Sequence, residues 1–333
     1  MGKLCTGIDI GANEVKFAVC KDGALLRREK AVLPDNVVRD GVVVSPAALG
    51  QFLKETAKER KLRRGACALV LPAAAAFFRR SVMPAMTAEH LKLNLPYEFR
   101  DYITEERSKY IFDYAVLGME HDEQGEPASM DIMAAAALRE TIESYRNILK
   151  YAGFTMQTAV PEEVAYSNLL RRYEAQNPTG EKREYCILDM GHSATRLYFY
   201  TGCAHEATQL IDYGCATLDE AIAETYNVDI HMAASYKTAN YEGALEAENC
   251  KNFYAKLAID LMQALNFYNY NNPENALRDI YFCGGGAQIQ PLKDAICERV
   301  TLATHDIETL MPPSEGSQEP ASLYPAAYGV TLQ

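Results

Sequence analysis

Two short turns in the sequence carry residue types that can bind phosphate. Asp9 and Gly11 follow one apolar segment near the N-terminus, and Asp189 and Gly191 follow another in the middle of the chain. Glycine lets the backbone approach a ligand, main-chain N–H groups in such a turn can bind phosphate oxygens, and a carboxylate can hold Mg²⁺ through water. One Asp-x-Gly turn is weak evidence, because both residues are common in turns. Two copies in matching contexts predict two facing turns that clamp a nucleotide.

A third segment, from Cys283 to Ala287, contains three successive glycines. It follows the apolar run DIYF and precedes a helical pattern, an arrangement in which a flat ring or a phosphate can lie close to the backbone. Its spacing is not that of the dinucleotide-binding motif G-x-G-x-x-G, and the sequence has no Walker A motif. The segment therefore predicts backbone contact with a nucleotide in a protein that uses neither of these two motifs.

An internal repeat predicts the elements that position these turns. LCTGIDIGANEVKFAVCKDG and YCILDMGHSATRLYFYTG each combine an apolar strand, an Asp-x-Gly turn and an alternating strand that ends at glycine. Each continues into a third extended segment, LLRREKAVL or EATQLIDYG, and helical patterns follow at 45–60, 217–227, 252–270 and 289–300. We expect two related α/β domains, each of which begins with a three-stranded meander.

The block 77–151 interrupts this pattern with about three strands and two helices, which predicts a small α+β subdomain inserted into the first domain. A second, shorter insertion separates the two parts of the second domain. The predicted boundaries are 1–76 and 152–183 for the first domain, 77–151 for its insertion, 184–227 and 253–333 for the second domain, and 228–252 for the short insertion.

Composition narrows the class of protein. The 333 residues are 48% hydrophobic, and 33 Lys and Arg against 45 Asp and Glu give a net charge of -12, which disfavours a nucleic acid partner. The nine cysteines lack the spacing of zinc sites and indicate reduced, cytoplasmic thiols. The longest uncharged run, 65–78, is too short to span a membrane, and no signal peptide begins the sequence. We therefore expect a cytoplasmic protein without direct membrane insertion.

Several stretches resemble a known family. GIDIGANEVKFAV, LDMGHSATRLYFY and YFCGGGAQIQPL are similar to the phosphate 1, phosphate 2 and adenosine motifs of the superfamily of actin, heat-shock chaperone and sugar kinase ATPases. LPDNVVRDGVV, SVMPAMTAEHLKLNLPYEFRDYI, TLDEAIAETYNVDI and YPAAYGVTL occur in the order found in the PilM family of type IV pilus assembly proteins, which is related to the cell-division protein FtsA. The resemblance implies an actin-like, ribonuclease-H-like fold: duplicated α/β domains around a nucleotide cleft, with a small α+β insertion in the first.

The resemblance also implies roles for matching positions, with ATP or ADP and Mg²⁺ as cofactors. Asp9, Gly11, Ala12 and Asn13 would form the first phosphate loop, with Lys16 on the next strand. Asp189, Gly191, His192 and Ser193 would form the second, and Gly284, Gly285 and Gly286 would lie against the adenosine. Asp9 and Asp189 would hold Mg²⁺ through water.

Two positions depart from the family's pattern. Glu162 matches the acidic residue near the γ-phosphate, and is the candidate catalytic residue, but Glu163 stands where relatives have Pro. In the helix that normally reads A-E-x-x-K, Lys237 is retained as a nucleotide-binding residue while Ser235 replaces the Glu that binds the ribose. Serine is too short for that contact and has no charge. We therefore expect weakened nucleotide binding and weak or no ATP hydrolysis.

The resemblance implies a docking role at a type IV pilus or related secretion assembly, in which a groove bounded by the inserted subdomain receives the N-terminal peptide of a PilN-like inner-membrane protein. Leu91, Leu95, Tyr97 and Phe99 are the apolar candidates for that groove. Self-association is a further expectation. The alternatives are an FtsA-like cell-division or filament-forming protein and a small-molecule kinase, whose general base could be Glu162.

Overall fold

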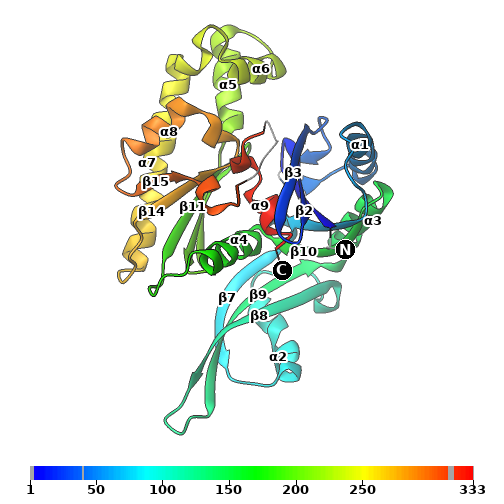
Figure 1. Cartoon of the computed structure of the whole chain (residues 1–333), viewed down its shortest axis with the longest axis vertical. Helices are drawn as coiled ribbons and strands as arrows, with labels where there is room; N and C mark the ends of the chain where they lie inside the picture. Colours follow the sequence, from blue (N-terminus) through cyan, green and yellow to red (C-terminus); the bar gives the residue numbers. More distant parts are fainter. Residues whose placement is uncertain (1–3, 40, 314–318, 333) are drawn as a thin grey trace. The chain divides into compact units, whose positions relative to one another are not determined.

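The computed structural model describes residues 4–39, 41–313 and 319–332, which form two compact units (Figure 1). Unit 1 comprises Met1–Asn168 and Ala326–Gln333, and unit 2 comprises Leu169–Pro325. The long helix α4 (Glu162–Gln176) carries the chain from unit 1 into unit 2.

Unit 1 is built on a five-stranded sheet in the order β10-β6-β1-β2-β3. The first three strands form the predicted antiparallel meander, whereas β6 and β10 lie parallel to β1. Its strands are β1 (Leu4–Ile10), β2 (Glu14–Lys21), β3 (Ala24–Val32), β6 (Ala66–Leu71) and β10 (Thr155–Pro161). A separate two-stranded ladder consists of β4 (Val38–Arg39) and β5 (Val42–Val43).

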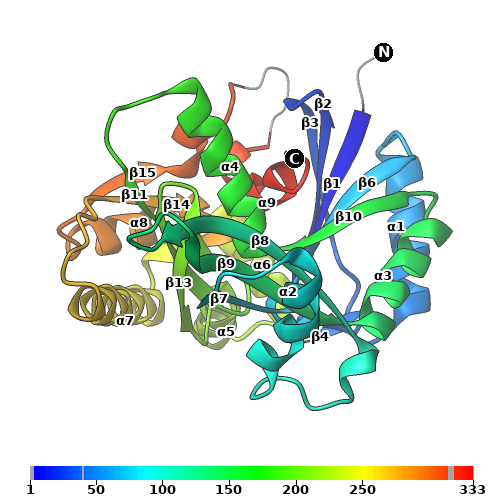
Figure 2. The same cartoon turned by 90° about the horizontal axis from the view of Figure 1, so that it is seen from below.

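Two helices, α1 (Pro46–Glu59) and α3 (Arg139–Tyr151), run alongside each other on the same side of this sheet (Figure 2). Pro46 suits the first turn of α1, where its missing N–H has no helical partner. Leu49 and Leu53 of α1 then pack with Ile148 and Leu149 of α3 in one buried cluster, which also contains the inner face of β1 and β6. Apolar spacing at three and four residues thus produces the core of unit 1.

The inserted strands β7 (Phe77–Pro84), β8 (Tyr110–His121) and β9 (Pro127–Leu138) form an antiparallel sheet in the order β7-β9-β8. The short helix α2 (Ala88–Asn94) and a 3₁₀ turn, Leu95–Phe99, lie against it. The expected groove residues Leu91, Leu95 and Phe99 are buried in the core of this subdomain, because its own sheet needs an apolar cover. Tyr97 is exposed, with the Arg107 guanidinium 3.9 Å from the centre of its ring.

The domain boundaries differ from the predicted ones at three places. The predicted first domain runs to residue 183, but unit 2 begins at Leu169, within α4. The predicted insertion ends at residue 151, but α3 packs against α1 in the core of unit 1, so the separate sheet ends at Leu138. The predicted second domain runs to residue 333, but the C-terminal helix α9 (Pro325–Gly329) and the described residues after it pack in unit 1. Gly7 on β1 permits this packing, since a Cβ there would lie 1.7 Å from the carbonyl oxygen of Ala327.

Unit 2 repeats the strand arrangement of unit 1, with the order β13-β12-β11-β14-β15. An antiparallel meander is again extended by two parallel strands. Its strands are β11 (Glu184–Met190), β12 (Thr195–Thr201), β13 (Ala204–Ile211), β14 (Asp279–Cys283) and β15 (Ala303–Asp306). Its helices are α5 (Cys215–Tyr226), α6 (Ile230–Ala239), α7 (Glu248–Asn271) and α8 (Gln290–Cys297).

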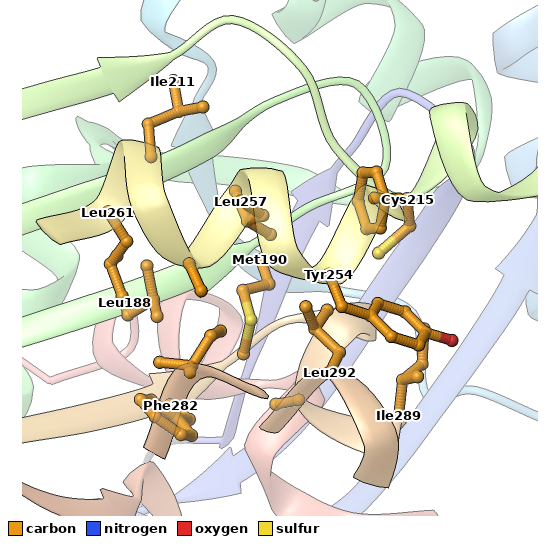
Figure 3. Packing of buried hydrophobic residues seen from close by; sticks show 14 of the residues in the cluster. Leu188, Met190, Ile211, Cys215, Tyr254, Leu257, Leu261, Phe282, Ile289 and Leu292 are labelled. Carbon is orange, nitrogen blue, oxygen red and sulfur yellow. The ribbon is translucent and has the colours of Figure 1, made fainter. Parts of the chain in front are cut away.

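One buried cluster joins the unit 2 sheet to its helices. Leu257 and Leu261 of α7, Leu292 of α8 and Leu188 and Phe282 of the sheet belong to it (Figure 3). The core therefore fixes β11 and β14, the two strands that precede the second Asp-x-Gly turn and the glycine segment.

Candidate nucleotide-binding site

The first turn connects β1 to β2. The Gly11 N–H donates to the Glu14 carbonyl at 2.9 Å, which closes the turn over Ala12 and Asn13. The carbonyl of Asn13 accepts from the Leu33 N–H at 2.8 Å, which ties the turn to the end of β3. A Cβ on Gly11 would lie 3.1 Å from the Glu14 oxygen, so a larger residue there would force the turn to shift.

Lys16 places a positive charge beside this turn. It lies directly opposite Asp9 across the β1–β2 ladder, and its Nζ is 3.9 Å from Asp9 Oδ2. The two side chains retain only 19% and 15% of their exposure. The positive charge is therefore held beside the carboxylate at the end of β1, and both side chains are only partly exposed.

Glu162 lies at the same edge of the unit 1 sheet as Asp9. Asp9 pairs with Val70 on β6, and Val70 pairs with Val160 on β10, all in parallel register. Because parallel strands end at a common edge, Glu162, the first residue of α4, follows β10 at the edge where β1 ends just after Asp9. The structure thus brings two predicted acidic site residues to one edge, from strands that lie two spacings, or roughly 10 Å, apart.

The second turn has the same local geometry as the first. The Gly191 N–H donates to the Ala194 carbonyl at 3.0 Å, and Ser193 is exposed. The start of α5 also supports this turn, because the N–H groups of Cys215 and Ala216 donate to the carbonyls of Gly191 and His192 at 3.0 and 2.8 Å. Turn and helix are therefore held together by main-chain hydrogen bonds.

The glycine segment packs directly against the end of β11. Gly284 has a φ of +82°, and a Cβ there would lie 2.4 Å from Asp189 Oδ1. A Cβ on Gly286 would lie 2.6 Å from the Cβ of Met190. A Cβ on Gly285 would have no heavy atom within 4 Å of it. Gly284 and Gly286 thus have a packing reason to be glycine, whereas Gly285 has open space beside it.

Lys237 forms an ion pair that the sequence analysis missed. Its Nζ lies 2.6 Å from Oδ1 and 2.8 Å from Oδ2 of Asp219, which is 3% exposed. His192 Nδ1 is 4.0 Å from the same carboxylate. One signal could have revealed Asp219: it occupies a buried position of the amphipathic α5 pattern, next to Leu218 and one turn after Cys215.

Ser235, the position at which the family resemblance implies a Glu, forms a hydrogen bond within its own helix. Its hydroxyl donates to the carbonyl of His231 at 3.0 Å, a common arrangement for a serine inside a helix. The hydroxyl therefore has a local partner, and the charge that a glutamate would supply is absent at this position.

Cys215 adjoins this region but is not a nucleophile. Burial raises the pKa of its thiol to about 11, and the carboxylates of Asp219 and Asp189 act in the same direction against the opposing effect of Lys237. The thiol is therefore protonated at neutral pH.

Among the residues that the structure describes, no three His, Cys, Asp or Glu side chains form a group that could hold a metal ion. None of the helices within 4–39, 41–313 and 319–332 is long and apolar enough to cross a membrane.

A sequence profile of the type IV pilus assembly protein PilM matches residues 7–317. The chain belongs to this family. Curated protein sequences gave no significant match.

Solved structures show the same fold for this PilM-family chain. It is similar to a PilM-PilN type IV pilus biogenesis complex, with a TM-score of 0.81, 22% identity, and coverage of 98% of this chain and 97% of that one. It is also similar to the ethanolamine utilization protein EutJ from Carboxydothermus hydrogenoformans (TM-score 0.62, 15% identity, coverage 100% and 90%). A third is MreB 5 of Spiroplasma citri bound to AMPPNP (TM-score 0.54, 13% identity, coverage 99% and 95%). The predicted actin-like fold is confirmed, and the chain is an actin-like protein of type IV pilus assembly.

Proposed function

We propose that this chain is a cytoplasmic, ATP-binding scaffold that docks the N-terminal tail of a PilN-like inner-membrane protein and so lies at the inner face of the membrane through its partner. The family match over residues 7–317 carries this proposal, together with the similarity to a structure described as a PilM-PilN complex.

Nucleotide binding is supported by the local geometry of each unit. Each Asp-x-Gly turn is closed by a main-chain hydrogen bond, and each has a carboxylate at the end of the preceding strand. We propose that the turns bind phosphate oxygens of ATP or ADP, and that Asp9 and Asp189 hold Mg²⁺ through water. The neighbour MreB 5, which was solved with AMPPNP, has the same fold.

We place the docking site in a cavity of unit 1. Its volume is about 240 Å³, equal to roughly eight waters at about 30 Å³ each, so one or two apolar side chains would fit. Its walls come from β5, the segment after β6 and the N-terminal part of α3, where the inserted strand β9 leads into that helix. The lining residues are Gly41, Val42, Val43, Ala74, Ala75, Glu140, Thr141, Ser144, Tyr145 and Ile148. This mixture of apolar wall and polar rim suits a short peptide.

The test is binding of a peptide of about 15 residues from the N-terminus of a PilN-like protein of the same organism. Ser144→Phe would fill the cavity and should abolish binding, whereas Asn147→Phe, on an exposed position of the same helix outside the cavity, should leave it intact. A parent protein that binds the peptide no better than a scrambled version would refute docking. Equal binding by both variants would refute this location.

Self-association and the FtsA-like alternative stay predictions. Sedimentation of the purified chain with and without Mg-ATP tests both, because a filament-forming protein would enter large assemblies.

A further inference from the structure

The strongest unassigned feature of unit 2 is a buried carboxylate that contacts two predicted nucleotide-binding residues at once. We infer that Asp219 is a positioning residue for nucleotide binding, which holds the Lys237 ammonium at the second turn; this inference rests on the proposed nucleotide-binding function. Asp219 itself need not touch the ligand.

The position of Asp219 relative to the turn is set by the backbone. The N–H groups of Cys215 and Ala216 bind the carbonyls of Gly191 and His192, and Gly214 lets the chain approach, since a Cβ there would lie 2.5 Å from the Gly191 oxygen. Asp219 is one helical turn further along α5. The carboxylate is thus fixed at a constant distance from the phosphate-binding turn.

Charge and burial explain why Asp219 controls Lys237. A carboxylate with 3% exposure is stable only with a cation or hydrogen-bond donors around it. The ammonium of Lys237 lies within 2.8 Å of both of its oxygens. An ammonium has three N–H donors, and one of them donates to Oδ2, whereas Oδ1 lies at ion-pair distance without a hydrogen bond. The Lys237 side chain keeps 18% of its exposure, so its remaining donors can point elsewhere.

The ion pair also anchors α6, the helix that carries Lys237. Ala233 is the buried residue of this ten-residue helix, all of which the structure describes. The ring of Tyr236 packs against those of Tyr226 and Tyr241, with centroids 5.5 and 4.4 Å apart. The bond between Lys237 and Asp219 adds a polar link between α6 and α5 to these apolar contacts.

His192 belongs to the same arrangement. Its Nδ1 is 4.0 Å from Asp219 Oδ2, so one carboxylate lies next to the imidazole of the second turn and the ammonium from the insertion. Loss of the negative charge of Asp219 would therefore affect both His192 and Lys237, which the family resemblance places at the nucleotide.

The experiment measures the dissociation constants of Mg-ATP and Mg-ADP by calorimetry for the parent, Asp219→Asn, Lys237→Met and the double variant. Asp306→Asn is the matched control, because it removes a lysine ion pair of the same unit, Lys293 with Asp306 at 2.6 Å, on α8 and β15. Circular dichroism confirms that each variant is folded at the assay temperature, so a loss of stability alone leaves the constants unchanged.

We expect Asp219→Asn and Lys237→Met each to weaken binding by about tenfold to a hundredfold, the range for loss of a hydrogen bond to a charged group. The double variant should bind no worse than the weaker single variant, since both changes remove one arrangement. Asp306→Asn should bind like the parent.

The failures are distinguishable. A parent that binds neither nucleotide at millimolar concentration overturns the proposed function, and this inference with it. A parent that binds, together with Asp219→Asn or Lys237→Met of unchanged affinity, overturns the inference alone. If Asp219→Asn does not fold, Lys237→Met decides: unchanged affinity refutes the positioning role.

Discussion

Replacement of Gly284 by alanine should destabilise unit 2 strongly, while the same change at the adjacent Gly285 should not. Gly284 has φ +82° and ψ −179°, a region essentially restricted to glycine, where another residue costs about 1–3 kcal/mol. The new methyl group would also lie 2.4 Å from Asp189 Oδ1 and 2.7 Å from the Met190 oxygen. Overpacking of this kind costs about 1–3 kcal/mol. The expected loss in the free energy of unfolding is therefore about 2–6 kcal/mol.

Gly285→Ala is the matched control. Its Cβ meets no heavy atom within 4 Å and its backbone is not in the left-handed region, so we expect a change within about 0.5 kcal/mol. The two substitutions add the same methyl group to neighbouring residues. A difference between them therefore measures the local geometry alone.

The assay is amide hydrogen exchange in β11 and β14, which reports the free energy of opening for these strands without requiring a two-state transition of the whole chain. Since 1.4 kcal/mol corresponds to a factor of ten, Gly284→Ala should accelerate their slowest exchange by about 30-fold or more. Acceleration below threefold, or equal acceleration by Gly285→Ala, would refute the packing explanation for the glycine segment.

The remaining predictions concern the ligand, the chemistry and a thiol. Mg-ATP should raise the melting temperature of the parent, and Asp9→Ala or Asp189→Ala should remove that rise and leave the apo protein folded; a parent unaffected at millimolar ATP would contradict a working site. Steady-state phosphate release should be far below the roughly 1–100 per second of kinases, and a rate in that range that is lost in Glu162→Gln would contradict the scaffold role. Because burial raises the pKa of Cys215 to about 11, iodoacetamide at pH 8 should modify the exposed Cys297 and spare Cys215 in the folded protein, as peptide mass spectrometry would show. The sign of the pH effect follows: the raised pKa of Cys215 contributes stability in full below about pH 9, and that contribution is lost as pH rises toward 11.

The sequence was sufficient to predict the fold because the repeat is local. Each copy contains a strand, a turn and a second strand in one continuous stretch, so alternation and turn residues alone specify the pairing of β1 with β2 and of β11 with β12. The repeat ends with the meander, so the outer strands were covered only by the fold that the family resemblance implies.

Packing between distant segments was not predictable in the same way. The pattern of α3 shows a buried face with Ile142, Tyr145, Ile148 and Leu149, but a periodic pattern does not specify which surface covers it. We assigned the helix to the insertion that precedes it, whereas it packs on α1. Likewise, the need for Gly7 becomes clear only when Ala327, far away in the sequence, is found against it.

The candidate site residues divide in the same way: those adjacent in sequence were predictable, and those paired across distant segments were not. Both turns were found because their residues are adjacent in sequence, and the structure shows that a main-chain hydrogen bond closes each of them. Asp219 was missed because its partner Lys237 comes from another helix, and a single acidic residue in an amphipathic pattern is usually taken as solvent-exposed.

The duplication also explains why the two Asp-x-Gly turns differ in the charges beside them. In unit 1 the cation beside the turn is Lys16, which lies opposite Asp9 within the meander itself. Arg196 has the equivalent register position opposite Asp189 in unit 2, yet this unit recruits a second cation, Lys237, from α6 in its insertion. A cation on a helix has no fixed register with the turn, so it needs a second residue to hold it. Duplicated strands can thus supply the same backbone twice, but the unit whose second cation comes from a helix needs a residue such as Asp219 to hold it.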